Sequence, residues 1–140
     1  FSQMLGIADA LPMLIAYLDR EQRYRFVNKA FARFFERPRS EILGRTMREV
    51  VGEEIYASRR PIIEAALAGE RQWFASNYEH PTRGSLAVQT EYIPQAGVEP
   101  GGGQGVVLLV QDVTEQRVAE RALRESEARF RRIADSAPVM

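Results

Sequence analysis

Few residues in this chain are of the types that carry out chemistry. The 140 residues contain no cysteine, which excludes disulfides, thiolate nucleophiles, thiolate metal sites and cysteine-linked chromophores. The single histidine, His80, lies in "EHPTRG", which predicts a hairpin turn, so we expect an exposed side chain rather than a ligand. Proton transfer would need a carboxylate facing a cavity, and Asp19 and Glu91 are the candidates near predicted strands. Either one buried opposite Tyr92 would favour an enzyme.

Two further features bear on cofactor binding. The single tryptophan, Trp73, could stack on a flavin or another ring, but a tryptophan in the core or packed on a sheet is the more common case. The segment "QAGVEPGGGQG" is rich in glycine, yet it lacks the following helix and lysine of a phosphate loop. We therefore interpret it as a hairpin loop rather than a nucleotide site. No metal site is predicted.

Composition limits the partners of the chain. With 45% hydrophobic and 27% charged residues, it is long enough for one globular core. Its 19 basic and 19 acidic side chains cancel, so we expect no nucleic-acid partner. No apolar run approaches the ~18 residues of a membrane span, and no signal-peptide pattern opens the sequence. The first residue, Phe1, is not methionine, which suggests a piece of a longer protein.

The hydrophobic pattern predicts an α+β fold with a single antiparallel sheet. Alternating residues and turn signals indicate five strands, and helical periodicity indicates several short helices and a longer one that Pro61 should either kink or split into two pieces. In the first hairpin we expect Tyr24 and Phe26 on one face, with Arg25 and Val27 on the other. The predicted strands are residues 13–18, 24–28, 71–80, 85–94 and 106–113, and the predicted helices are residues 2–10, 29–35, 39–44, 46–51 and 53–67.

The segment 114–135 has the pattern of a separate amphipathic helix. Its apolar or small positions are spaced four, three, four and three residues apart, which is the spacing of a coiled-coil seam. A helix of this length is marginal alone, so we expect a second copy of the chain to pack on the seam and form a homodimer. The seam residues are Ala119, Leu123, Ser126, Phe130 and Ile133.

The end of the chain repeats its beginning. Four residues near the start recur with the same spacing 126 positions later: Ile7, Ala8, Asp9 and Pro12 correspond to Ile133, Ala134, Asp135 and Pro138. An offset of this size is about one domain length, although chance similarity between two short helical segments is the alternative. We expect a domain over residues 1–113, a linker helix over 114–135 and the truncated start of a second, similar domain over 136–140.

Three segments resemble the PAS sensory domain: "YRFVNKAFARFF", "SEILGR" and "VVLLVQDVTEQRVAERAL". The last is the most specific, because Asp112-Val113-Thr114 resembles the Asp-aliphatic-Thr signature that ends a PAS core and begins its signalling helix. "LRESEARFRRIADSAPVM" resembles the approach to a further PAS domain. The resemblance implies a five-stranded antiparallel sheet, with short helices over one face and a C-terminal signalling helix.

The same resemblance implies a role in signalling rather than catalysis. We expect a cytoplasmic regulatory module of a bacterial protein whose output is a sensor histidine kinase or a cyclic-dinucleotide enzyme. Asn28, Asp112 and Thr114 match the family's residues at the first helix and the exit, where they would transmit the signal. From the residues alone, Asn28 is a helix cap before "KAFARFF", and Asp112 and Thr114 cap the exit helix; for these two residues, capping and signal transmission can hold together.

The identity of any ligand is left open. A cysteine-linked flavin is excluded, and haem held by a histidine on the long helix is disfavoured because residues 53–69 contain none. Asn77, Gln89, Tyr92 and Arg59 are polar groups that could orient a small molecule. The alternative is a ligand-free dimerisation spacer, which a core without a sizeable void would favour. The expected pocket residues are Phe26, Phe34, Ile55, Ile63, Leu67, Phe74, Tyr78, Val88, Tyr92 and Leu108.

Overall fold

The computed structural model describes residues 13–95 and 104–136. The predicted helix at residues 2–10 and most of the glycine-rich loop lie outside them. The strands are β1 (Leu14–Leu18), β2 (Tyr24–Val27), β3 (Gln72–His80), β4 (Gly84–Gln95) and β5 (Gly105–Asp112). The helices are α2 (Lys29–Phe34), α3 (Arg39–Ile42), α4 (Met47–Val51), α5 (Glu53–Leu67) and α6 (Thr114–Ser136).

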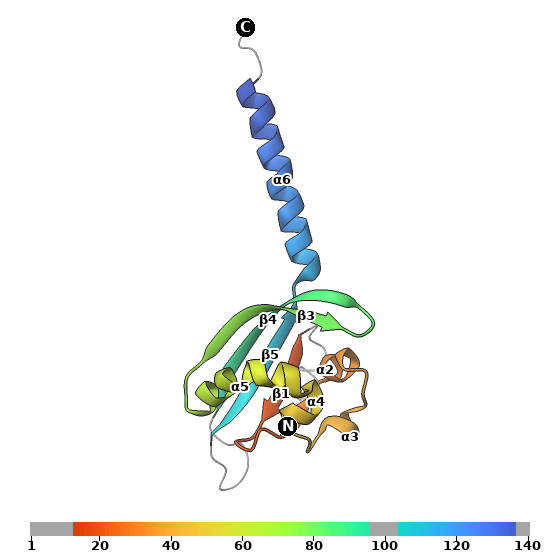
Figure 1. The fold of residues 1–140 in the computed structure, drawn as a ribbon, viewed down its shortest axis with the longest axis vertical. Coiled ribbons are helices and arrows are strands. Elements are labelled where there is room, and N and C mark those ends of the chain that lie inside the picture. The colour runs from red at the N-terminus through yellow and green to blue at the C-terminus, as the bar shows by residue number, and fades with distance from the viewer. Residues whose placement is uncertain (1–12, 96–103, 137–140) are drawn as a thin grey trace.

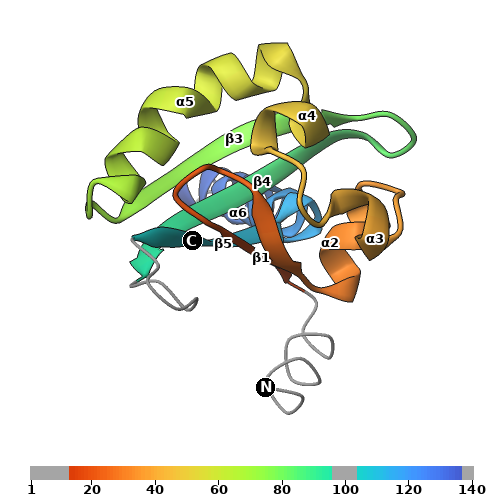
Figure 2. The same cartoon turned by 90° about the horizontal axis from the view of Figure 1, so that it is seen from below.

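The five strands form one antiparallel sheet in the order β2-β1-β5-β4-β3. Helices α2 to α5 lie together over one face of this sheet, which we call the inner face (Figure 2). Helix α6 leaves the end of β5 and projects away from the domain (Figure 1). This arrangement confirms the predicted fold class, including the C-terminal helix.

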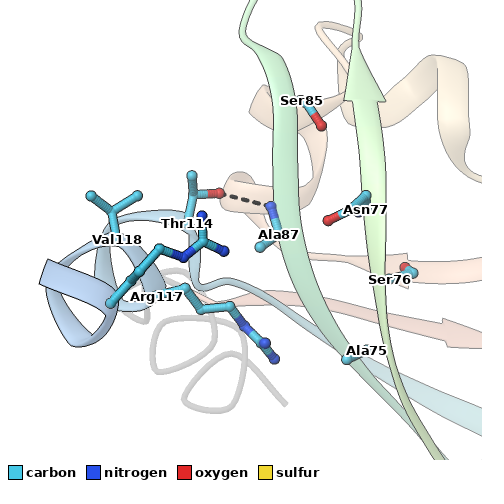
Figure 3. Close-up of a pocket in the computed structure, with 9 residues that line it drawn as sticks. Ala75, Ser76, Asn77, Ser85, Ala87, Thr114, Arg117 and Val118 are labelled. Carbon is cyan, nitrogen blue, oxygen red and sulfur yellow. Dashed lines mark hydrogen bonds between the residues drawn. The ribbon is translucent and has the colours of Figure 1, made fainter. Parts of the chain in front are cut away.

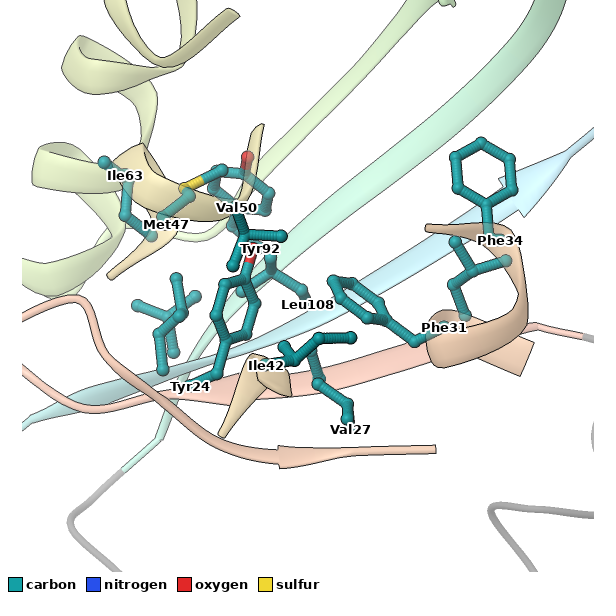
Figure 4. Packing of buried hydrophobic residues seen from close by; sticks show 14 of the residues in the cluster. Tyr24, Val27, Phe31, Phe34, Ile42, Met47, Val50, Ile63, Tyr92 and Leu108 are labelled. Atoms are coloured by element: carbon teal, nitrogen blue, oxygen red, sulfur yellow. The ribbon is translucent and has the colours of Figure 1, made fainter. Parts of the chain in front are cut away.

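The core lies between the helices and the inner face (Figure 4). Strand β4 alternates as predicted, because Leu86, Val88, Thr90 and Tyr92 are buried while the residues between them are partly exposed. Tyr24 from β2 is also almost fully buried and stacks obliquely on Phe31 of α2, with ring centroids 5.3 Å apart. Helix α5 continues through Pro61 as one element, so of the predicted kink or split, the split does not occur.

The first hairpin differs from the expected alternation. Phe26 pairs with Tyr17 and Val27 pairs with Ala16, but the register then shifts, so that Leu18 pairs with Tyr24. A bulge of this kind leaves one residue unopposed and changes which side chains share a face. Tyr24 and Val27 are therefore both buried, and Phe26 lies beside Tyr17 on the outer face. The assignment of Phe26 to the pocket is wrong for this reason.

Candidate functional site

A small cavity lies between the helices and the inner face of the sheet. Its volume is about 70 Å³, whereas pockets for drug-sized ligands measure roughly 300–1,000 Å³. Most of its lining is apolar or aromatic, and Arg59 is its one charged residue. The lining residues are Leu14, Tyr24, Phe31, Phe34, Phe35, Met47, Val51, Ile55, Arg59, Tyr78, Val88, Thr90, Tyr92, Leu108 and Val110.

Six of the ten expected pocket residues line this cavity: Phe34, Ile55, Tyr78, Val88, Tyr92 and Leu108. Three others belong to the surrounding core, since Ile63 is fully buried while Leu67 and Phe74 pack against the buried cluster. Tyr24 and Phe31 are not among the pocket residues expected from the sequence. An aromatic residue in a strand, followed by another in the next helix, is the pattern that could have predicted them. Tyr24 was on the expected face, but its role as a cavity wall was not recognised.

The phenols of the cavity are neutral over the physiological pH range. Burial, together with the nearby phenols of Tyr92 and Tyr78, raises the pKa of Tyr24 far above its ordinary value. Burial also raises the pKa of Tyr92, although the Arg59 guanidinium acts in the opposite direction. Arg59 donates to the Ser76 hydroxyl at 3.1 Å and lies 4.6 Å from the centroid of the Phe74 ring. The cavity therefore offers an apolar space with one cation at its margin.

The carboxylates considered for proton transfer lie elsewhere. Asp19 accepts hydrogen bonds from the Arg25 side chain at 2.7 Å and from the amides of Glu21 and Arg23, which fixes the turn between β1 and β2. Glu91 forms an ion pair with Arg71 and lies on the outer face, because the strand alternates and Tyr92 points inward. Neither carboxylate is buried opposite Tyr92, so the condition that would favour an enzyme is not met.

His80 is buried, so the expected exposed position is wrong. Only 6% of its surface is accessible, and its Nε2 donates to the carbonyl oxygen of Phe34 at 2.7 Å. Its Nδ1 accepts from the backbone amides of Thr82 at 3.2 Å and Arg83 at 3.1 Å. Because both amides can only donate, Nδ1 is the acceptor of the ring and Nε2–H is the donor. His80 thus joins the end of α2 to the β3–β4 turn.

The exit motif joins strands β4 and β5 and the β3–β4 turn at the base of α6. The Thr114 hydroxyl donates to Asp112 Oδ1 at 2.6 Å and accepts from the Ala87 amide of β4 at 2.9 Å. The other carboxylate oxygen of Asp112 accepts from Arg83 Nη2 at 3.1 Å. Partial burial opposes ionisation of Asp112, but the hydrogen bonds from Thr114 and the charge of Arg83 outweigh it and lower the pKa.

These contacts form a continuous connection between the cavity wall and the exit helix. Phe34 lines the cavity and bonds through its carbonyl to His80, which holds the amide of Arg83. The Arg83 guanidinium lies 5.9 Å from the centroid of the Phe34 ring and bonds to Asp112, the partner of Thr114. A displacement of α2 would therefore alter the groups that fix the first turn of α6.

Asn28 fixes the opposite end of α2. Its side-chain oxygen caps the helix by accepting from the Phe31 amide at 3.0 Å, and it also accepts from Ile15 of β1 at 3.1 Å. Its amide group donates to the Met13 carbonyl at 2.8 Å. The side chain is completely buried, so Asn28 both begins α2 and anchors it to the first strand.

The remaining predicted residues lie at the surface. All five seam positions on α6 are exposed, including 74% of the Phe130 surface. Trp73 is 62% exposed on the outer face of β3, so of the two expected positions, in the core or packed on the sheet, the core position is wrong. Of the polar candidates for the pocket, Arg59 and Tyr92 reach the cavity, whereas Asn77 and Gln89 lie on the outer face.

Two further properties concern only the described residues. No group of three or more histidine and carboxylate side chains is placed to hold a metal ion among them. In the same part of the chain, no helix combines the length and apolar character needed to cross a membrane.

The chain belongs to the PAS fold family, whose model matches residues 8–118. Domains of this family are parts of signalling proteins, generally have sensory roles and are typically regulatory rather than catalytic. They commonly dimerise within multidomain proteins. No curated protein sequence matches the chain.

Solved structures show the same fold. The PAS domain of BvgS from Bordetella pertussis is 25% identical with a TM-score of 0.64, and the match covers 91% of this chain and 96% of that one. A PAS domain from a two-component sensor histidine kinase is 13% identical with a TM-score of 0.61, covering 80% and 95%. VqmA of Vibrio cholera, in a complex with ligand and DNA, is 16% identical with a TM-score of 0.70, covering 91% and 59%.

Proposed function

We propose that this chain is a cytoplasmic relay module that converts a change in its helical layer into a change at the base of α6. The observation that carries the proposal is the connection from Phe34 through His80, Arg83 and Asp112 to Thr114. It joins the cavity wall to the exit helix without a break. Because hydrogen bonds between buried or charged groups depend strongly on geometry, movement of α2 would change how the first turn of α6 is held.

The output domain in this proposal is a histidine kinase or a cyclic-dinucleotide enzyme of a multidomain bacterial protein. A similar fold in a two-component sensor histidine kinase supports the first of these. Residues 136–140 would begin a second PAS domain, and α6 would connect the two. Exposed apolar side chains at Leu123, Phe130 and Ile133 support a homodimer in which the α6 helices pair.

The input in this proposal is a small, largely apolar molecule in the inner cavity. A space of about 70 Å³ is several times smaller than the roughly 300–1,000 Å³ of pockets for drug-sized ligands. A larger ligand would have to displace α2 or α5 from the sheet, and that displacement is the change that the connection would transmit. Arg59 is placed to pair with a negative group at the edge of such a ligand.

A ligand-free dimerisation spacer is the second candidate. The specific observation in its favour is the small volume of the cavity, because Tyr24, Phe31 and Tyr92 occupy space that a ligand would need. In this case α6 would hold two copies together, and the domain would pass on changes that arise in neighbouring domains.

Native mass spectrometry with an absorbance spectrum of the purified protein separates the two candidates. Added mass that is lost on denaturation, and that decreases in a Val88→Phe variant with a filled cavity, would support ligand sensing. A protein without added mass, whose stability does not respond to a library of small apolar compounds, would contradict ligand sensing and favour the spacer. A Val107→Phe variant on the partly exposed outer face of β5 provides the matched control.

A further inference from the structure

A second hollow lies outside the core, between the first two turns of α6 and the outer face of β3 and β4 (Figure 3). Its volume is about 400 Å³, which falls within the range of roughly 300–1,000 Å³ for small-molecule sites. Small side chains at Ala75 and Ala87 leave the space open, and Asn77 and Ser85 add polar groups along its wall. We call this hollow the outer groove.

Two arginines of α6 line the outer groove, and Figure 3 shows one of them, Arg117, beside the wall formed by the sheet. Arg117 and Arg121 are one helical turn apart. Neither guanidinium has an ion pair or side-chain hydrogen bond with any residue in the ranges 13–95 and 104–136. The groove therefore combines two unpaired cations with neutral hydrogen-bonding groups.

Helix stability does not explain this pair of arginines. Like charges four residues apart repel each other and cost about 0.2–0.5 kcal/mol. Within the first turn, where Arg117 lies, cations are also disfavoured because the helix dipole is positive there. A bound anion would remove the repulsion, because it would neutralise the two guanidiniums.

The seam and the outer groove occupy different sides of α6. Successive residues of a helix are turned by about 100° around its axis. The centre of the face formed by positions 114, 117, 118 and 121 therefore lies about 150° from the centre of the seam. A partner helix on the seam would therefore leave the arginines accessible. The groove remains available in the dimer that we propose above.

We propose that the outer groove binds a small molecule that carries a phosphate group. Guanidinium groups bind phosphate through pairs of parallel hydrogen bonds, and two of them can share the oxygens of one phosphate. Asn77 and Ser85 can donate further hydrogen bonds, and the volume leaves room for a small organic group beside the phosphate. The ligand would bridge α6 to β3 and β4 and hold the helix at one angle to the sheet. This site is separate from the inner cavity and does not depend on a ligand there.

Isothermal titration calorimetry with inorganic phosphate and glycerol 3-phosphate tests this site, with sodium chloride at matched ionic strength as the reference. Amide chemical shifts of Asn77, Ser85 and Ala87 report whether the probe occupies the groove. We expect saturable binding that is weaker by about tenfold in Arg117→Gln and in Arg121→Gln, because each loses charge-assisted hydrogen bonds. The double variant should lose detectable binding.

Arg131→Gln is the matched control. It removes the same charge from the same helix, about 15 Å beyond Arg121 along the helix axis, and the variant should bind within about twofold of the unchanged protein. Absence of saturable binding to either probe, an equal loss in Arg131→Gln, or equal affinity for succinate would overturn the proposal. None of these results would contradict the proposed relay. That proposal is tested separately, by hydrogen exchange of the Ala87 amide in the absence of phosphate.

Discussion

Replacement of Thr114 by valine should release the first turn of α6 from β4. Valine has nearly the shape of threonine but lacks the hydroxyl, so the variant loses the 2.6 Å bond to Asp112 and the 2.9 Å bond from the Ala87 amide. Asp112 keeps its bonds to the Thr114 backbone amide and to Arg83, since neither needs the hydroxyl. The Ala87 amide loses its acceptor.

The size of the effect follows from these two bonds. A typical hydrogen bond contributes about 1 kcal/mol, and an amide left without a partner costs about 1–3 kcal/mol. We therefore expect the free energy for opening this junction to fall by about 2 kcal/mol, which corresponds to a roughly 30-fold change in the opening equilibrium. The sheet and the inner core should remain folded, because the described contacts of Thr114 lie at the junction.

Amide hydrogen exchange measured by NMR reads this junction directly. The exchange of the Ala87 amide should accelerate by about 30-fold in Thr114→Val, while buried amides of β1 should be much less affected. Thr114→Ser keeps the hydroxyl and is the matched control, so its Ala87 amide should remain protected. Unchanged protection of Ala87 in the valine variant, or equal loss in the serine variant, would refute the role assigned to the hydroxyl.

Three other predictions follow from the same geometry. Leu123→Lys or Phe130→Glu should weaken self-association in analytical sedimentation while the domain still folds, and unchanged dimer affinity in both would disprove the seam. His80→Gln can retain a donor toward Phe34, and His80→Asn can retain an acceptor for the turn. In urea titrations, each variant should therefore lower the free energy of unfolding by about 1–2 kcal/mol, which is less than the loss in His80→Ala. Equal losses in all three variants would contradict the role of His80 on both sides of its ring. Because the pKa of Asp112 is lowered from 3.8 by folding, its carboxylate stabilises the fold above that value and this stabilisation is lost as the pH falls through the lower, folded-state pKa. The stability difference between the protein and Asp112→Asn should therefore shrink below about pH 4, and a constant difference down to pH 2 would contradict the assignment.

The strands could be predicted from the sequence where burial alternates without interruption. In β4 the alternating residues Leu86, Val88, Thr90 and Tyr92 are predicted on one face, and the structure buries these four on the inner face. The exit motif was recognisable because Asp112 and Thr114 stand at the boundary between an apolar strand and a charged helix. In both places, the local pattern and the tertiary contacts impose the same requirement.

The predictions that differ from the structure concern residues at which a tertiary contact overrides the local sequence pattern. A bulge in the first hairpin, which no residue type announces, moved Phe26 to the outer face. His80 was assigned to the surface because turns are usually exposed, but its ring satisfies both the turn amides and a carbonyl 46 residues away. The outer groove was missed because it joins Arg117 and Arg121 to strands that are distant in sequence.

The position of β5 in the sheet has a mechanical consequence. β5 is the middle strand, bonded on one side to β1 and on the other to β4, and α6 continues directly from its end. A force along α6 would load both rows of hydrogen bonds in shear at once, whereas a strand at the edge of the sheet has only one row to resist it. The base of α6 is therefore a stiff pivot, and the helix can tilt or rotate about it more easily than it can slide.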